Sequence, residues 1–258
     1  MNNAKKIMSI GLAAALASVA VGAPDAKQDT GAQPMVPVEL YACKWREGKD
    51  MGDLGKLNEK FKAMMDKNNA PYSAWMLTPQ FRAGSDGFDV AWLGSWTTGA
   101  AMGKMVDNRV GGGEAAQLFE SYTDVVDCSD GHMLMSSATL HAPDGPPDNG
   151  VVMFSSCTVD DDSNMEAAMK AHMKAGADIR GRGAKSYSWL FYPALGFGET
   201  DFDYYQVAAF DNYGDLGVAF DAMMGGGWAA RQKLYDGVVS CDSPRAYDAR
   251  LVHKAAAN

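Results

Sequence analysis

The sequence predicts an α+β protein built from two tandem copies of one module of about 114 residues. Shifting the sequence by 114 positions brings residues of the same type together, and a shift by 113 continues the match near the module end. A repeat of this length indicates a duplicated domain, because solenoid repeats run about 20–50 residues. The matching pairs include Cys43 and Cys157, Trp75 and Trp189, Pro79 and Pro193, Phe88 and Phe202, Asp89 and Asp203, the glycines at 111–113 and 225–227, and Cys128 and Cys241.

Each module is expected to begin with a short strand and a helix. The strands are predicted at 38–44 and 151–157. The helices follow from apolar residues that recur at spacings of three and four, which form one stripe on a helix. These residues are Met51, Leu54, Leu57, Phe61, Met64 and Met65 in the first copy and Met165, Met169, His172 and Met173 in the second.

Two further strands and a helical stretch complete the module. Strands are predicted at 72–81 and 88–96 in the first copy and at 186–195 and 202–210 in the second. A Gly- and Ala-rich stretch then indicates two short helical pieces broken at the three glycines. A last strand is predicted at 122–128 and again at 235–241. The order is βαββαβ, that of ferredoxin-like folds.

The four cysteines allow three pairings, and the strand order selects one of them. In the βαββαβ order the first and last strands lie side by side, and each copy has one cysteine on each of these strands. We therefore expect disulfides between Cys43 and Cys128 and between Cys157 and Cys241. The alternative is buried free thiols, which an oxidising compartment disfavours.

The N-terminal residues 1–23 are expected to be a signal peptide. Lys5 and Lys6 precede an uncharged apolar run at 7–21, and small residues follow it. The alternative, a retained anchor, would need about 20 apolar residues to span a bilayer. We therefore expect a periplasmic or secreted protein with no stable membrane insertion after cleavage.

The remaining boundaries follow from the repeat. Residues 142–148 are rich in Pro, Gly and Asp, which form turns and interrupt helices and strands. We expect a flexible leader at 24–36, a first module at 37–128, a linker at 129–149, a second module at 150–241 and a C-terminal tail at 242–258.

Charge and motifs exclude several functions. The chain has 23 basic and 32 acidic residues, a formal net charge of -9, and no dense basic patch. Nucleic acids and anionic membrane surfaces bind basic patches, so neither is an expected partner. The sequence also lacks a P-loop and the G-x-S-x-G, H-E-x-x-H and C-x-x-C motifs, so no cofactor and no metal is predicted.

Strand residues supply the candidates for a site. The ligand-binding candidates are Tyr41, Trp75, Trp92, Trp189 and Gln206. They could line a pocket that differs between the halves or belong to an ordinary core. Asp89 and Asp203 are acidic strand residues present in both copies. Each is a candidate general base or cation ligand, or accepts hydrogen bonds in a structural role.

The pattern Trp75-x3-Pro79-x4-Gly84-x3-Phe88-Asp89, repeated at 189–203, is similar to that of a group of uncharacterised secreted bacterial proteins. Two fused ferredoxin-like modules resemble the dimeric α+β barrel superfamily, in which two sheets enclose a cavity. The resemblance implies a pseudo-twofold α+β barrel formed within one chain. The superfamily includes oxygenases, isomerases and haem enzymes, so the fold does not select an activity.

The haem enzymes of that superfamily bind iron through a helix histidine. Of the four histidines in this chain, only His172 lies on a predicted helix. Its neighbours on the helix face are the apolar Met169 and Met173, so it is either an iron ligand or a packed helix residue.

The leading functional expectation is a monomer or weak homo-oligomer that binds a small apolar or aromatic molecule between its two sheets. The first alternative is a cofactor-free oxygenase or isomerase in the same cavity, with Asp89 or Asp203 as the base. The second alternative is a structural or interaction module without a ligand.

Overall fold

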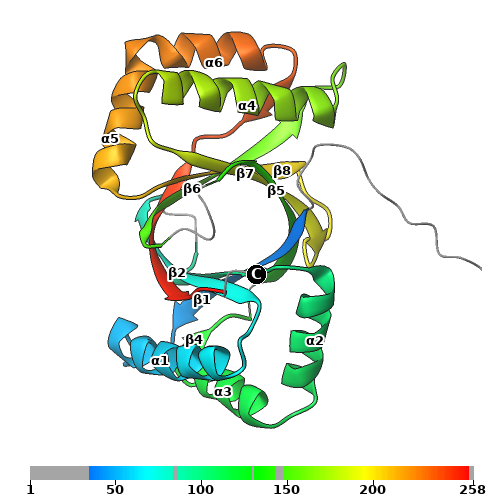
Figure 1. The fold of residues 1–258 in the computed structure, drawn as a ribbon, viewed down its shortest axis with the longest axis vertical. Helices are drawn as coiled ribbons and strands as arrows, with labels where there is room; N and C mark the ends of the chain where they lie inside the picture. The colour runs from blue at the N-terminus through cyan, green and yellow to red at the C-terminus, as the bar shows by residue number, and fades with distance from the viewer. Residues whose placement is uncertain (1–34, 84–86, 130, 143–147, 256–258) are drawn as a thin grey trace, which may run out of the picture. The chain divides into compact units, whose positions relative to one another are not determined.

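The computed structural model describes residues 35–83, 87–129, 131–142 and 148–255. These residues form an α+β fold in which a closed antiparallel barrel has helices on its outside (Figure 1). Within these ranges, no helix combines the length and the apolar character needed to cross a membrane. The signal peptide predicted at 1–23 lies outside the described residues, as does the predicted leader except for its last two residues.

The N-terminal half contains five strands and three helices. Asp50 caps the first helix by accepting hydrogen bonds from the N–H groups of Gly52 and Asp53, and Thr98 caps the second in the same way. The elements are β1 (Val36–Trp45), α1 (Met51–Lys67), β2 (Tyr72–Phe81), β3 (Val90–Trp96), α2 (Gly99–Val110), α3 (Glu114–Thr123), β4 (Val126–Asp127) and β5 (His132–His141).

The C-terminal half repeats this order of elements. Asn164 and Asn212 cap its first two helices. A π-helical turn, η1 (Met223–Gly227), replaces the break between the last two, and Gly226 adopts a φ of 110° there. The elements are β6 (Gly150–Val159), α4 (Met165–Gly181), β7 (Tyr187–Leu195), β8 (Tyr204–Phe210), α5 (Tyr213–Ala222), α6 (Trp228–Tyr235), β9 (Val239–Cys241) and β10 (Arg245–His253).

Eight of the ten strands close into the barrel. They follow one another in the order β10, β2, β3, β1, β5, β7, β8 and β6, and β6 pairs with β10 to complete the ring. The short strands β4 and β9 lie outside the ring and pair with the ends of β1 and β6. Helices α1, α2 and α3 lie on one side of the barrel and α4, α5 and α6 on the other (Figure 1).

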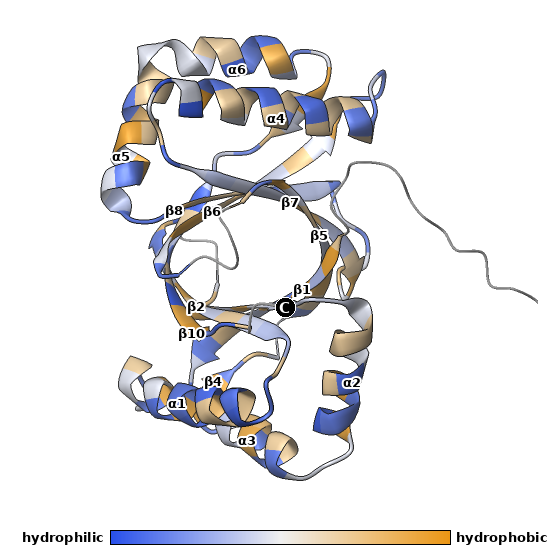
Figure 2. Ribbon diagram, viewed as in Figure 1, coloured by the Kyte–Doolittle hydropathy of each residue, from blue (hydrophilic) through white to orange (hydrophobic). Residues whose placement is uncertain are grey.

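Side chains from every barrel strand pack together inside the ring. Because side chains alternate along a strand, one set faces this interior and the other faces the helices. The helices carry both apolar and polar residues, as expected for helices that cover a sheet and face solvent (Figure 2). The buried interior residues are Val38, Trp75, Leu77, Ala91, Leu93, Met135, Val152, Phe154, Phe191, Val207, Ala209, Tyr247 and Ala249.

The predicted disulfides are confirmed. Cys43 is bonded to Cys128 and Cys157 to Cys241, which leaves no free cysteine in the described part of the chain. The first bond joins β1 to the residue that follows β4, and the second joins β6 to β9. Two disulfides are compatible with a protein of an oxidising compartment.

The end of each half differs from the prediction. Residues 122–128 were expected to form a strand, but α3 continues to Thr123 and β4 has only two residues. The predicted linker contains β5, and the predicted tail contains β10. Both additional strands complete the ring, because β5 joins β1 to β7 and β10 joins β2 to β6. Hydrogen bonding across the ring overrides the weak strand pattern of these segments.

Candidate active site

A polar site lies on the outer face of the barrel in the N-terminal half. Val38 and Leu40 of β1 face the barrel interior. Side chains alternate along a strand, so Glu39 and Tyr41 face the helices. The Glu39 residue is only 4% exposed. An isolated carboxylate at such a position would be costly, so its hydrogen bonds define the site.

Two side chains bind the Glu39 carboxylate. Tyr72 Oη donates to Oε1 at 2.6 Å, and His132 Nε2 lies 2.8 Å from Oε2. Trp92 Nε1 in turn donates to Tyr72 Oη at 2.7 Å. Burial, and then the charge of Glu39, raise the pKa of Tyr72 well above its usual value, so this hydroxyl stays a donor.

The contact with Glu39 distinguishes the two ring nitrogens of His132. A carboxylate that only accepts hydrogen bonds needs a donor at Nε2, so in the neutral imidazole Nδ1 is the acceptor nitrogen. The His132 side chain is 41% exposed, whereas that of Glu39 is 6% exposed. No described residue hydrogen-bonds to Nδ1, which leaves this nitrogen available as a base.

Aromatic and cationic groups surround the histidine. Tyr41 stacks on the His132 ring, with ring centroids 3.8 Å apart and an interplanar angle of 8°. Arg109 of α2 donates from Nη1 to Tyr41 Oη at 2.7 Å and lies over the ring of Phe119 of α3. Burial and the charge of Glu39 raise the pKa of Tyr41, so its hydroxyl stays protonated.

Glycine at position 94 makes room for this arrangement. Gly94 of β3 is paired with Glu39, and a Cβ at Gly94 would lie 1.8 Å from Tyr72 Oη. We expect Gly94→Ala to destabilise the protein by about 1–3 kcal/mol, because the fully buried Tyr72 ring must move. Urea unfolding followed by tryptophan fluorescence measures this loss.

Gly103→Ala is the matched control. A Cβ at Gly103 meets nothing within 4 Å. Gly103 lies within α2, where alanine is favoured over glycine by about 0.5–1 kcal/mol. An equal loss of stability in both variants would contradict the role given to Gly94.

The structure separates the predicted ligand-binding residues. Tyr41 and Trp92 are paired across β1 and β3 and belong to the site described above. Trp75 and Trp189 instead lie in the barrel interior, on the opposite face of the sheet. Gln206 of β8 lies in the other half, paired with residues of β6 and β7. The five residues therefore do not line one pocket.

Asp89 and Asp203 both bind backbone groups at strand ends. Asp89 Oδ2 accepts a hydrogen bond from Trp45 N at 3.0 Å, and Asp203 Oδ2 accepts one from Val159 N at 2.7 Å. The backbone N–H of each aspartate donates to the carbonyl of the cysteine on the neighbouring strand. Both carboxylates thus fix equivalent ends of paired strands.

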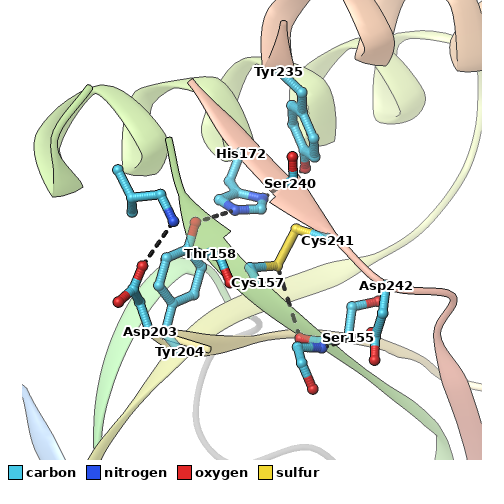
Figure 3. The surroundings of a disulfide bond; sticks show 12 residues. Ser155, Cys157, Thr158, His172, Asp203, Tyr204, Tyr235, Ser240, Cys241 and Asp242 are labelled. Atoms are coloured by element: carbon cyan, nitrogen blue, oxygen red, sulfur yellow. Dashed lines mark hydrogen bonds between the residues drawn. A yellow bond between two sulfur atoms is a disulfide. The ribbon is translucent and has the colours of Figure 1, made fainter. Parts of the chain in front are cut away.

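The surroundings of His172 do not fit a haem. Its Nε2 lies 2.8 Å from Tyr204 Oη and its Nδ1 2.6 Å from Tyr235 Oη, so both ring nitrogens have partners (Figure 3). The space between α4 and the sheet is filled by buried side chains, among them Cys157, Leu190 and Tyr204. A planar macrocycle has no slot there, and His172 is a packed helix residue.

Sequence reasoning missed Glu39, Tyr72, Arg109 and His132 as site residues. The sequence contains a signal for Glu39, because an acidic residue inside an otherwise apolar strand is unusual and can indicate a site. Offset 114 gives Met153 in the second copy, so Glu39 is not among the acidic strand residues that both copies share. His132 lay in a segment expected to be a linker.

Comparison with known proteins identifies the fold. The sequence matches no protein-family model and none of the curated proteins. The solved structures that share the fold include a proposed monooxygenase from Lactobacillus acidophilus (10% identity, 85% of this chain and 96% of that chain, TM-score 0.52), one from Fusobacterium nucleatum (6%, 86% and 94%, 0.54) and an anthrone oxidase-like protein (15%, 87% and 95%, 0.51). The resemblance to dimeric α+β barrels is confirmed at the level of the fold.

These findings correct the predicted function, which was the binding of a small apolar or aromatic molecule. The solved structures of this fold named above are described as proposed monooxygenases and as an anthrone oxidase-like protein, not as binding proteins. The space between the two sheets, where an apolar ligand was expected, contains side chains from all eight barrel strands. The alternative prediction placed an active site in this same space, and the same side chains occupy it. The predicted partner, a small apolar or aromatic ligand of a monomer or weak homo-oligomer, is corrected together with the function.

Proposed function

We propose that this protein is an enzyme that transfers a proton with His132 and Glu39, on the outer face of the barrel. One observation carries the proposal: a buried carboxylate is hydrogen-bonded to an imidazole whose side chain is 41% exposed. A histidine without a function at the surface would not need a buried carboxylate as its partner. A carboxylate with a purely structural role would not need an exposed histidine as its partner. This pairing orients the ring toward a proton-transfer role.

The proton moves in a definite direction. His132 Nδ1 takes a proton from the substrate, and the imidazolium that forms lies beside the Glu39 carboxylate. The carboxylate keeps its hydrogen bond from Tyr72 throughout, which holds it in place. General-base catalysis of this kind contributes about 10²–10⁴-fold to a rate.

The surroundings of the pair favour a substrate class. The positively charged guanidinium of Arg109 donates a hydrogen bond to Tyr41, the tyrosine that stacks against His132. A cation at this position stabilises a substrate that becomes an anion when it loses a proton. Tyr41 and Phe119 provide aromatic surfaces beside it. We therefore infer a phenol or an enolisable carbonyl compound as the substrate.

We also propose that the barrel consists of two ferredoxin-like modules, each extended to include β5 or β10. The constant sequence offset and the equivalent strand pairings in the two halves support this division. The proton-transfer residues would then belong to the first module alone. Offset 114 places Met153, Ser186 and Gln206 at the positions of Glu39, Tyr72 and Trp92.

Export from the cytoplasm is part of the proposal. The apolar segment after Lys5 and Lys6 supports a signal peptide, and the two disulfides support an oxidising compartment. The protein would then work in the periplasm or outside the cell.

Solvent deuterium exchange tests the proposed activity. The protein is incubated in D₂O with a panel of phenols and 1,3-dicarbonyl compounds, and deuterium incorporation is followed by mass spectrometry. We expect exchange above the buffer rate for at least one compound. His132→Gln and Glu39→Gln should each lower that rate by about 10²–10⁴-fold.

His141→Gln is the matched control. His141 ends the strand that His132 begins, and it is exposed, so its loss should leave the rate unchanged. ¹⁵N chemical shifts should also show the His132 proton on Nε2. No exchange with any compound, or equal rates in the His132 and His141 variants, would refute the proposal.

A further inference from the structure

A disulfide in the C-terminal half lies beside a buried histidine. The sulfurs of Cys157 and Cys241 and a ring nitrogen of His172 lie within 4.8 Å of one another. The three residues come from β6, β9 and α4, and the histidine ring points toward the disulfide (Figure 3). Among the described residues, no other three metal-binding side chains are grouped this closely.

The N-terminal half provides an internal comparison. Asn58 and His172 each stand seven residues after the first residue of their helix. Tyr122 Oη donates to Asn58 Oδ1 at 2.9 Å, just as Tyr235 Oη contacts His172 Nδ1. Asparagine is thus sufficient to satisfy the tyrosine hydroxyl beside a disulfide. The histidine adds a nitrogen that can bind a metal.

Two tyrosines orient the His172 ring. Tyr204 Oη and Tyr235 Oη fix the ring from both sides. A metal that takes one nitrogen would displace one tyrosine hydroxyl and leave the other nitrogen hydrogen-bonded to its tyrosine. Such outer partners orient metal-bound histidines in proteins generally.

We propose that reduction of the Cys157–Cys241 disulfide converts this group into a binding site for a thiophilic divalent cation such as Zn²⁺. The two sulfurs and one His172 nitrogen would be the protein ligands, and water would take the fourth position. Zinc–sulfur bonds of about 2.3 Å at a tetrahedral angle separate two sulfurs by roughly 3.8 Å. In the oxidised protein the two sulfurs are covalently bonded, so they must move apart after reduction to reach that separation, and a ring nitrogen of His172 lies within 4.8 Å of both.

The chemistry balances with a dithiol as the reductant. One thiolate of the dithiol attacks the sulfur of Cys241, a residue that is less buried than Cys157, and the electron pair of the broken bond leaves on Cys157 Sγ. The second thiol of the reductant then closes its own disulfide. The two cysteines gain two electrons and two protons, and metal binding releases these two protons.

Cobalt titration of the reduced full-length protein tests the proposal. The protein is reduced under nitrogen and titrated with Co²⁺, whose thiolate charge-transfer absorbance reports sulfur ligands, and Zn²⁺ is then added in competition. We expect one metal ion per chain. His172→Asn, which copies the N-terminal half, should weaken binding by more than about 100-fold, since losing even an outer partner of a ligand costs about 10–100-fold.

A second variant distinguishes the two disulfides. Cys157→Ser with Cys241→Ser keeps Cys43, Cys128 and Asn58, and it should bind no cobalt after reduction. Circular dichroism follows the fold, and a reduced chain that folds only with metal and only with His172 also supports the site. Equal binding by wild type and His172→Asn would overturn the proposal, as would a reduced chain that stays unfolded when metal is added.

Discussion

The free energy of unfolding of the oxidised protein is expected to fall by up to about 1.4 kcal/mol per pH unit through His172 as the pH drops below about 6.5. Burial lowers the pKa of this histidine in the folded state to about 3, whereas the unfolded chain has the ordinary value. Between these two values the unfolded state binds one proton more than the folded state. Stability is therefore complete above about pH 6.5 and decreases toward pH 3, by roughly 4 kcal/mol in total.

Comparison with His172→Asn isolates this effect from other titrating groups. Urea unfolding is measured from pH 4 to 8 in both proteins without reductant. The variant has a lower stability at neutral pH, because Tyr204 loses a buried partner, whereas asparagine at position 172 can still accept a hydrogen bond from Tyr235. Its stability should nevertheless depend less on pH, and the two curves should converge as the pH falls. Parallel curves would show that His172 titrates normally in the folded protein.

The repeat in the sequence carried most of the fold prediction. Cys43 and Cys157 at one offset, with their partners at nearly the same offset, were sufficient to predict both disulfides. The final strands were missed for a physical reason. In β5 the residues Ser136 and Ser137 interrupt the apolar pattern, and both neighbours of this strand come from distant parts of the chain. A strand held by such pairings has a weak local signal.

The site was harder to predict than the fold because it depends on contacts between distant segments. Glu39 and Tyr72 are 33 residues apart, and Glu39 and His132 are 93 apart. Tyr41 and Trp92 were candidates because the two halves differ at these positions, and the structure places them beside Glu39. The principle that a site lies where duplicated halves differ was useful. The residues of the site could not be grouped from the sequence, because only the closed ring of strands brings them together.

Removing the Cys43–Cys128 disulfide is expected to lower the free energy of unfolding by about 4 kcal/mol. The bond links residues separated by 85 positions, and its loss frees the unfolded chain to a correspondingly larger ensemble. Cys43→Ala with Cys128→Ala makes this change, and urea unfolding without reductant measures it. An unchanged stability would contradict the prediction.

The second disulfide gives a matched comparison. Cys157 and Cys241 are 84 positions apart, and loop entropy depends only on the logarithm of this separation. Cys157→Ala with Cys241→Ala should therefore cost the same within about 1 kcal/mol. A much smaller cost would indicate that this bond is not formed in solution.

The two losses together approach the total stability of a typical domain, which is about 5–15 kcal/mol. A fully reduced chain should therefore lie near its unfolding threshold, and a metal bound only by the folded state would then have a large effect. Free Zn²⁺ at about 1,000 times the dissociation constant adds about 4.1 kcal/mol, which is close to the contribution of one disulfide. Zinc should accordingly restore the reduced wild-type protein and leave the reduced His172→Asn variant unfolded. If zinc restored both proteins equally, the ion would be acting elsewhere than beside His172.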